Sequence, residues 1–122
     1  MRTAIRTTAI AALSLLAAGN AGAATLYTAP ASPDYTNQII SCRVTNVSSS
    51  PRHVQVQVRG YGGTVVNSGT YVVSPGATEG GADTTTGAYC KFTVLDGSAK
   101  HVHAAASYLK SDGAITAVVP AQ

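Results

Sequence analysis

His101 and His103 are the residues best suited to chemistry, because they stand two positions apart near the C-terminal end of the chain. Side chains at that spacing on a β-strand point to the same side of the sheet, so both imidazoles could bind one metal ion. His53, or a turn carboxylate such as Asp112, would serve as a third ligand. No third ligand is set by local spacing, and exposed histidines beside a lysine also suit an ordinary polar sheet face. A periplasmic metal-binding protein is therefore one functional hypothesis.

The other polar residues do not form a pattern typical of an enzyme. No serine occupies a strand-to-helix nucleophile elbow, and the sequence predicts no helix to build one. Asp96 and Asp112 precede glycines, where aspartate favours turn geometry on its own account. Glu79 and Asp83 lie in a glycine-rich loop, which is a poor platform for two carboxylates at a fixed separation. We therefore predict no catalytic activity and no cofactor.

Cys42 and Cys90 are the two cysteines of the chain and stand 48 positions apart. An even count in an exported protein favours one disulfide, because export takes the chain to an oxidising compartment. A metal site is a weaker alternative, since neither cysteine has a second cysteine or a histidine at ligand spacing. Two unlinked buried thiols are the other alternative. A bridge of this length would restrict the unfolded chain by about 4 kcal/mol.

Residues 1–23 have the organisation of a secretory signal peptide. Arg2 and Arg6 give a positive start, the apolar run IAALSLLAA follows, and a small-x-small cleavage site ends at Ala23. The alternative, an N-terminal membrane anchor, needs about 20 apolar residues, roughly twice the length of this run. We therefore expect a soluble mature protein, secreted or periplasmic, with no membrane insertion after signal cleavage.

Cleavage after Ala23 would also change the charge. It removes Arg2 and Arg6 but no acidic residue, so the net charge falls from +3 to +1. The basic residues that remain are scattered singly along the chain, whereas nucleic-acid binding needs several of them together to neutralise phosphates. We predict no nucleic-acid partner.

The mature part predicts a folded all-β domain. Of the 122 residues, 45% are hydrophobic and only 11% are charged, which argues against a disordered chain. Val54, Val56 and Val58 alternate with polar residues, as in a strand with one buried face. Turn signals recur about every ten residues and indicate about seven short strands.

Turn chemistry predicts how these strands connect. Asn67-Ser68-Gly69 should separate two short strands. Asp96-Gly97 should form a hairpin that joins the strand of Cys90 to a partner over residues 100–109. Pro30 and Pro33 indicate an extended N-terminal arm or loose first strand over residues 24–38, which leaves residues 39–122 for the domain itself.

Tyr61 and Tyr89 stand beside glycine-rich turns. An exposed tyrosine offers a large contact area with a polar tip, so the two could form a binding surface for a protein or a glycan. Partial burial at the edges of the domain is the alternative.

The chain resembles small exported bacterial proteins of one immunoglobulin-like domain that carry no assigned activity. The features that carry the resemblance are Cys42, the Gly87 and Tyr89 that precede Cys90, and about seven strands. The expected fold is an antiparallel immunoglobulin-like β-sandwich, and both cysteines lie on apolar strand faces, so their disulfide would join the two sheets. The leading hypothesis is a non-catalytic binding or structural module with an unknown protein or glycan partner. A surface-fibre subunit assembled by strand exchange is a further alternative.

Overall fold

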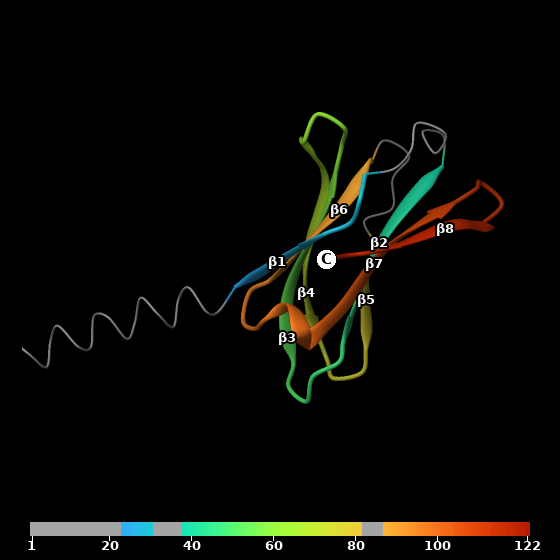
Figure 1. Ribbon diagram of the computed structural model, residues 1–122. Helices are drawn as coiled ribbons and strands as arrows, with labels where there is room; N and C mark the ends of the chain where they lie inside the picture. Colours follow the sequence, from blue (N-terminus) through green and yellow to red (C-terminus); the bar gives the residue numbers. More distant parts are fainter. Residues whose placement is uncertain (1–22, 31–37, 82–86) are drawn as a thin grey trace, which may run out of the picture.

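The computed structural model describes residues 23–30, 38–81 and 87–122, so the predicted signal segment up to residue 22 lies outside the described part. Within these ranges the chain forms strands in two antiparallel sheets that pack face to face (Figure 1). This arrangement confirms the predicted all-β sandwich. In chain order the elements are β1 (Ala24–Tyr27), β2 (Ile39–Asn46), β3 (Arg52–Arg59), β4 (Val65–Val73), β5 (Thr78–Gly80), β6 (Tyr89–Val94), the 3-10 helix η2 (Ala99–His101), β7 (Val102–Leu109) and β8 (Ile115–Pro120).

The first sheet has the strand order β1-β6-β3-β4. Strand β3 is half-buried because apolar and polar residues alternate along it. Val54, Val56 and Val58 are fully buried, while the polar residues between them face outward. On β6, Cys90 and Phe92 alternate with outward-facing residues in the same way. The alternation predicted from the sequence is confirmed, and it places the polar side chains of β3 on the outer face of this sheet.

The second sheet has the strand order β5-β2-β7-β8. Its inward-facing residues include Ile40 and Val44 of β2 and Ala106 and Tyr108 of β7, all of which have 1% exposure or less. They pack against the buried valines and Phe92 of the first sheet in one hydrophobic core. In the described part of the chain no helix is long and apolar enough to cross a membrane.

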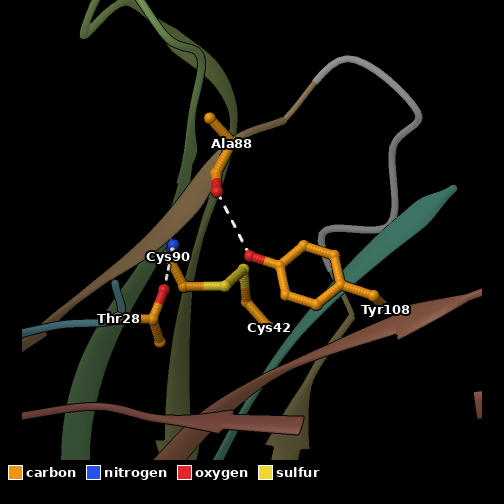
Figure 2. Close-up of a disulfide and its surroundings, with 5 residues drawn as sticks. All are labelled: Thr28, Cys42, Ala88, Cys90 and Tyr108. Carbon is orange, nitrogen blue, oxygen red and sulfur yellow. Dashed lines mark hydrogen bonds between the residues drawn. A yellow bond between two sulfur atoms is a disulfide. The ribbon is translucent and has the colours of Figure 1, made fainter. Parts of the chain in front are cut away.

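The Cys42–Cys90 disulfide joins β2 of the second sheet to β6 of the first (Figure 2), as predicted. Both residues are fully buried, and their Cα atoms are 5.8 Å apart. Two neighbouring polar groups make hydrogen bonds: the Cys90 N–H donates to Thr28 Oγ1 at 2.9 Å, and the Tyr108 hydroxyl donates to the Ala88 carbonyl at 3.2 Å. Among the described residues the buried Ser41 hydroxyl beside Cys42 has no hydrogen-bond partner. The bond from Tyr108 joins β7 of the second sheet to the residue before β6 of the first, so it links the two sheets beside the disulfide.

The connection at Asp96-Gly97 differs from the predicted hairpin. Strand β6 pairs with β1 and β3, whereas β7 pairs with β2 and β8, so the two strands belong to opposite sheets. The turn starts a crossing between the sheets that contains η2. The hairpin prediction was wrong because an Asp-Gly signal specifies a local turn but not the strand with which the next segment pairs.

Strand β4 also differs from the prediction. It runs through Asn67-Ser68-Gly69 without a break, because each of these residues pairs with a residue of β3. Gly69 leaves room for a neighbouring ring, since a Cβ at this position would lie 3.0 Å from the Tyr71 hydroxyl oxygen. A turn-like tripeptide is thus held extended by its neighbouring strand.

Strand β1 pairs with β6 in the first sheet, as in the predicted alternative of a loose first strand. Tyr27 exchanges two backbone hydrogen bonds with Gln122, at 2.9 Å each, and the Ala121 N–H donates to the Ala104 carbonyl of β7 at 2.8 Å. The last two residues therefore cross from the second sheet to the first and close one side of the sandwich. The rest of the predicted arm, residues 31–37, lies outside the described residues.

Candidate functional site

The outer face of the first sheet gathers large polar and aromatic side chains from three strands. Because side chains alternate along a strand, these residues face away from the buried valines and Phe92. The register places them in two neighbouring rows, with Lys91 beside both Tyr27 and Gln57, and Tyr89 beside Arg59. We call this surface the tyrosine face; it consists of Tyr27, Gln57, Arg59, Tyr89 and Lys91.

The two tyrosine rings of this face lie against each other. Their centroids are 6.4 Å apart with planes tilted by 49°, a distance typical of interacting aromatic pairs. The Lys91 ammonium nitrogen lies 5.8 Å from the centroid of the Tyr27 ring, within the range of a cation–π contact. Tyr27 is nevertheless 48% exposed. The rings thus contact each other and Lys91, while Tyr27 stays accessible and Tyr89 is half-buried.

Arg59 is fixed beside the rings by neutral acceptors. Its Nε and Nη2 both donate to Gln57 Oε1, at 3.0 and 2.8 Å, and its Nη1 donates to the Gly63 carbonyl at 2.9 Å. Among the described residues, neither Arg59 nor Lys91 has a carboxylate within salt-bridge distance. The tyrosine face therefore combines two tyrosine rings, an amide and two cations whose charge no described carboxylate neutralises.

Tyr61, the other tyrosine of the predicted surface, lies in the turn between β3 and β4 and is 57% exposed. The ring partner of Tyr89 is Tyr27, which the sequence analysis did not single out. The missed signal is the alternation of Leu26 and Thr28, both buried, with the outward-facing Tyr27. The nearby prolines suggested an arm and concealed a strand of four residues.

His101 and His103 lie on different elements. His101 ends η2, whereas His103 is on the outer face of β7, so the shared strand assumed for the pair is not present. The Ser98 N–H donates to His101 Nδ1 at 3.0 Å. Across residues 23–30, 38–81 and 87–122, no group of three or more histidine, cysteine, aspartate or glutamate side chains could hold a metal ion. Metal binding by these histidines stays a prediction without that strand to support it.

His53 contacts Asp96 instead of the other histidines. The distance from His53 Nδ1 to Asp96 Oδ2 is 2.7 Å, and the His53 N–H donates to Asp96 Oδ1 at 2.9 Å. Arg52 Nη1 donates to the Asp96 carbonyl at 2.7 Å. Burial raises the pKa of the Asp96 carboxyl, but the hydrogen bonds from His53 and the charges of His53 and Arg52 outweigh this effect and lower the pKa below its ordinary value.

An aspartate–histidine contact also occurs in hydrolases, where a hydroxyl nucleophile lies against the second ring nitrogen. Here the remaining contacts of Asp96 go to the backbone of His53 and to the guanidinium of Arg52. The contacts hold the start of the crossing between the sheets against β3. This arrangement is typical of an aspartate that stabilises a turn.

Comparisons with known proteins extend the description of the fold. No protein-family model matches the chain, and no curated protein matches it. The chain is similar in structure to the crystal structure of Thermotoga maritima 1070, with a TM-score of 0.53 and 11% sequence identity. The match covers 83% of this chain and 94% of that chain. At this identity the similarity shows a shared fold and nothing about function.

Proposed function

We propose that this protein is an exported, non-catalytic binding module, and that the tyrosine face binds an acidic glycan. The observation that carries the proposal is the Tyr27–Tyr89 pair, in which Tyr27 is exposed and Tyr89 half-buried, with two cations beside it on the same sheet face. The aromatic rings would stack on the apolar faces of sugar rings, and the cations would bind carboxylate groups of the glycan.

The charges favour an acidic ligand over a neutral one. Lys91 and Arg59 project on the same side of the sheet, and the described carboxylate side chains lie elsewhere, in β5 and in the turns that follow β6 and β7. Arg59 has its guanidinium oriented by Gln57 and Gly63, so less conformational entropy is lost when it binds a carboxylate. A protein partner is the alternative, since tyrosine and arginine are also enriched in protein interfaces.

Export is supported by two features. The buried disulfide is typical of proteins that fold in an oxidising compartment. The predicted cleavage after Ala23 would leave Ala24, the first residue of β1, at the new N-terminus. The mature chain would therefore begin with a strand of the sandwich.

The pairing of β1 supports a self-contained module over a fibre subunit. Strand β1 pairs with β6 of its own domain and exchanges hydrogen bonds with Gln122. A subunit that donates its N-terminal strand to a neighbour would have to break these contacts.

Native gel electrophoresis with an immobilised polysaccharide tests the binding surface. We expect polygalacturonate to retard the oxidised mature protein and dextran, a neutral polysaccharide, to leave its mobility unchanged. Tyr27→Ala should weaken the affinity for polygalacturonate about tenfold, because it removes the more exposed ring of the pair. Tyr61→Ala shows whether the surface extends to the turn after β3.

The control for this experiment is a matched change of charge on the other sheet. Arg59→Gln with Lys91→Gln should abolish retardation, whereas Arg43→Gln with Lys100→Gln removes the same two residue types outside the tyrosine face and should preserve it. Equal losses in the two double variants would mean that net charge alone drives retardation, and the proposed site would be wrong. If polygalacturonate does not retard the unmodified protein, the glycan proposal fails and the protein alternative replaces it.

The export proposal is tested separately by expression of the full chain in a bacterium. We expect the processed protein in the periplasm or the medium, with a mass that corresponds to residues 24–122 and an intact disulfide. A protein that keeps residues 1–23 and stays in the cytoplasm would contradict the proposal.

A further inference from the structure

A groove with a volume of about 640 Å³ opens at the start of β7, on the side of the sandwich away from β4. We call it the β7 groove. Its polar lining residues include Arg43 of β2, Lys100 of η2 and His103 of β7. Its apolar wall includes Leu26, Ala104 and Ala105. The volume lies within the range of about 300–1,000 Å³ that is usual for small-molecule sites.

The groove forms because β8 is shorter than its neighbour β7. Strand β8 ends at Pro120, which pairs with Ala105, so it does not extend along the first residues of β7. The chain then leaves the second sheet, because Gln122 pairs with Tyr27 of β1. Between β1 and the start of β7, the described residues leave a space lined by small side chains. The groove is thus a consequence of the way the C-terminus closes the sandwich.

The charged side chains that line the groove are positive. Register places Arg43 beside Ala105, and Thr45 beside His103, on the outer face of β2 and β7. Within the described residues, Arg43 and Lys100 have no ion pair, and no carboxylate lines the groove. Two cations that are far apart in sequence therefore line one groove, which also has an apolar wall. Two positive groups with no carboxylate partner favour a ligand with one anionic group.

We infer that the β7 groove binds a small carboxylate with an apolar tail, such as a medium-chain fatty acid. The carboxylate would lie at Arg43 and Lys100, and the alkyl chain would cover Ala105 and Pro120, which share the outer face of the second sheet with Arg43. A polyanion such as a nucleic acid needs a longer row of cations than this groove provides. The site is separate from the tyrosine face, because none of the five residues of that face lines the groove.

Titration calorimetry at low salt, with sodium octanoate as the probe and the oxidised mature chain as the protein, tests the inference. Saturable binding of octanoate is expected, with octan-1-ol and sodium acetate each bound at least about tenfold more weakly, because one lacks the charge and the other the tail. Arg43→Gln with Lys100→Gln should weaken octanoate binding about tenfold or more. Ala105→Leu should weaken it as well, because the larger side chain fills the groove.

The matched control is Arg59→Gln with Lys91→Gln, which should leave octanoate binding unchanged. The two double variants therefore separate this site from the tyrosine face: each is the test of one site and the control for the other. Far-ultraviolet circular dichroism confirms that each variant is folded, and the outward position of Ala105 favours a folded leucine variant.

Three results of the calorimetry would overturn the inference. Octanoate could fail to saturate the protein, both double variants could weaken its binding equally, or octan-1-ol could bind as tightly as octanoate. A fourth arm uses vesicles of anionic phosphatidylglycerol: if Arg43 and Lys100 matter for vesicle binding but not for octanoate, the groove recognises a membrane surface, and the proposed free carboxylate is wrong.

Discussion

Single residues fix the ends of the sandwich, and Asn46 shows how. Its side chain has no accessible surface and makes four hydrogen bonds. Nδ2 donates to the carbonyls of Ser50 and Val73, both at 2.8 Å, while Oδ1 accepts from the N–H and hydroxyl of Ser48 at 2.9 and 2.7 Å. All the capacity of the amide is used, so this residue holds the loop before β3 against the end of β4. The loop in turn positions Arg52, because Arg52 Nε donates to Ser48 Oγ at 3.1 Å.

At the same end of the molecule, His101 gives a prediction about pH. Desolvation and the positive charges of Arg52 and Lys100 lower the pKa of His101 from its ordinary value of 6.5, and the charge of Asp96 offsets this only in part. The Ser98 N–H, which donates to Nδ1, also requires the unprotonated ring. We therefore expect the imidazole signals of His101 to shift at a pH below 6.5 in a proton NMR titration. The spectrum of His101→Gln lacks these signals and so identifies them.

The lowered pKa has a consequence for stability. Because the unfolded chain holds the proton on His101 more tightly than the folded chain does, the contribution of His101 is present above the unfolded pKa and is lost as the pH falls through the folded pKa. Urea denaturation between pH 7 and pH 5 should show a smaller decrease in stability for His101→Gln than for the unmodified protein. Identical decreases would contradict the assignment.

At the scale of elements, the second sheet depends on a close approach at Gly80. This residue of β5 pairs with Arg43 of β2 and has φ of +132°. A Cβ here would lie 2.2 Å from the carbonyl oxygen of Cys42, which is part of the backbone and cannot move aside easily. We expect Gly80→Ala to lower the free energy of unfolding by about 1–3 kcal/mol or more.

The neighbouring glycine provides the control. Gly81 has φ of +146°, and nothing lies within 4 Å of a Cβ added there, so Gly81→Ala has backbone strain without the clash. Urea denaturation of both variants isolates the effect of the contact with Cys42. If Gly81→Ala destabilises the protein as much as Gly80→Ala, the close packing of β5 on β2 does not matter for stability.

At the scale of the whole molecule, the disulfide links the two sheets across the core. Its loop spans 48 positions, so the loop-entropy model gives a stabilisation of about 4 kcal/mol. This is a large share of the roughly 5–15 kcal/mol that is usual for a domain of this size. Reduction with dithiothreitol should therefore move the urea midpoint strongly downward. The Cys42→Ala, Cys90→Ala double variant should denature near the reduced midpoint and show no response to reductant; equal midpoints for oxidised and reduced protein would contradict this account.

Features that depend on neighbouring residues could be predicted from the sequence, whereas the pairing of strands far apart in the sequence could not. Strand β3 and the disulfide were predictable, because alternation of Val54 and Val56 and an even number of cysteines are properties of the sequence itself. The crossing after β6 was not, since Asp96-Gly97 specifies a turn but the partner of β7 is chosen by packing across the whole domain. Tyr27 was missed because its strand has only four residues, so the alternation of Leu26 and Thr28 around it is too short to stand out beside the nearby prolines.

The strand order of the second sheet has a consequence for the time at which the protein can fold. Strand β2 lies between β5 and β7, and the side of the sandwich is closed by Gln122, the final residue. A chain whose last third is still in transit lacks β7, so the apolar face and one edge of β2 stay uncovered. The pairing of β2 with β7 therefore forms only after β7 has been synthesised, which makes the second sheet a late product of folding.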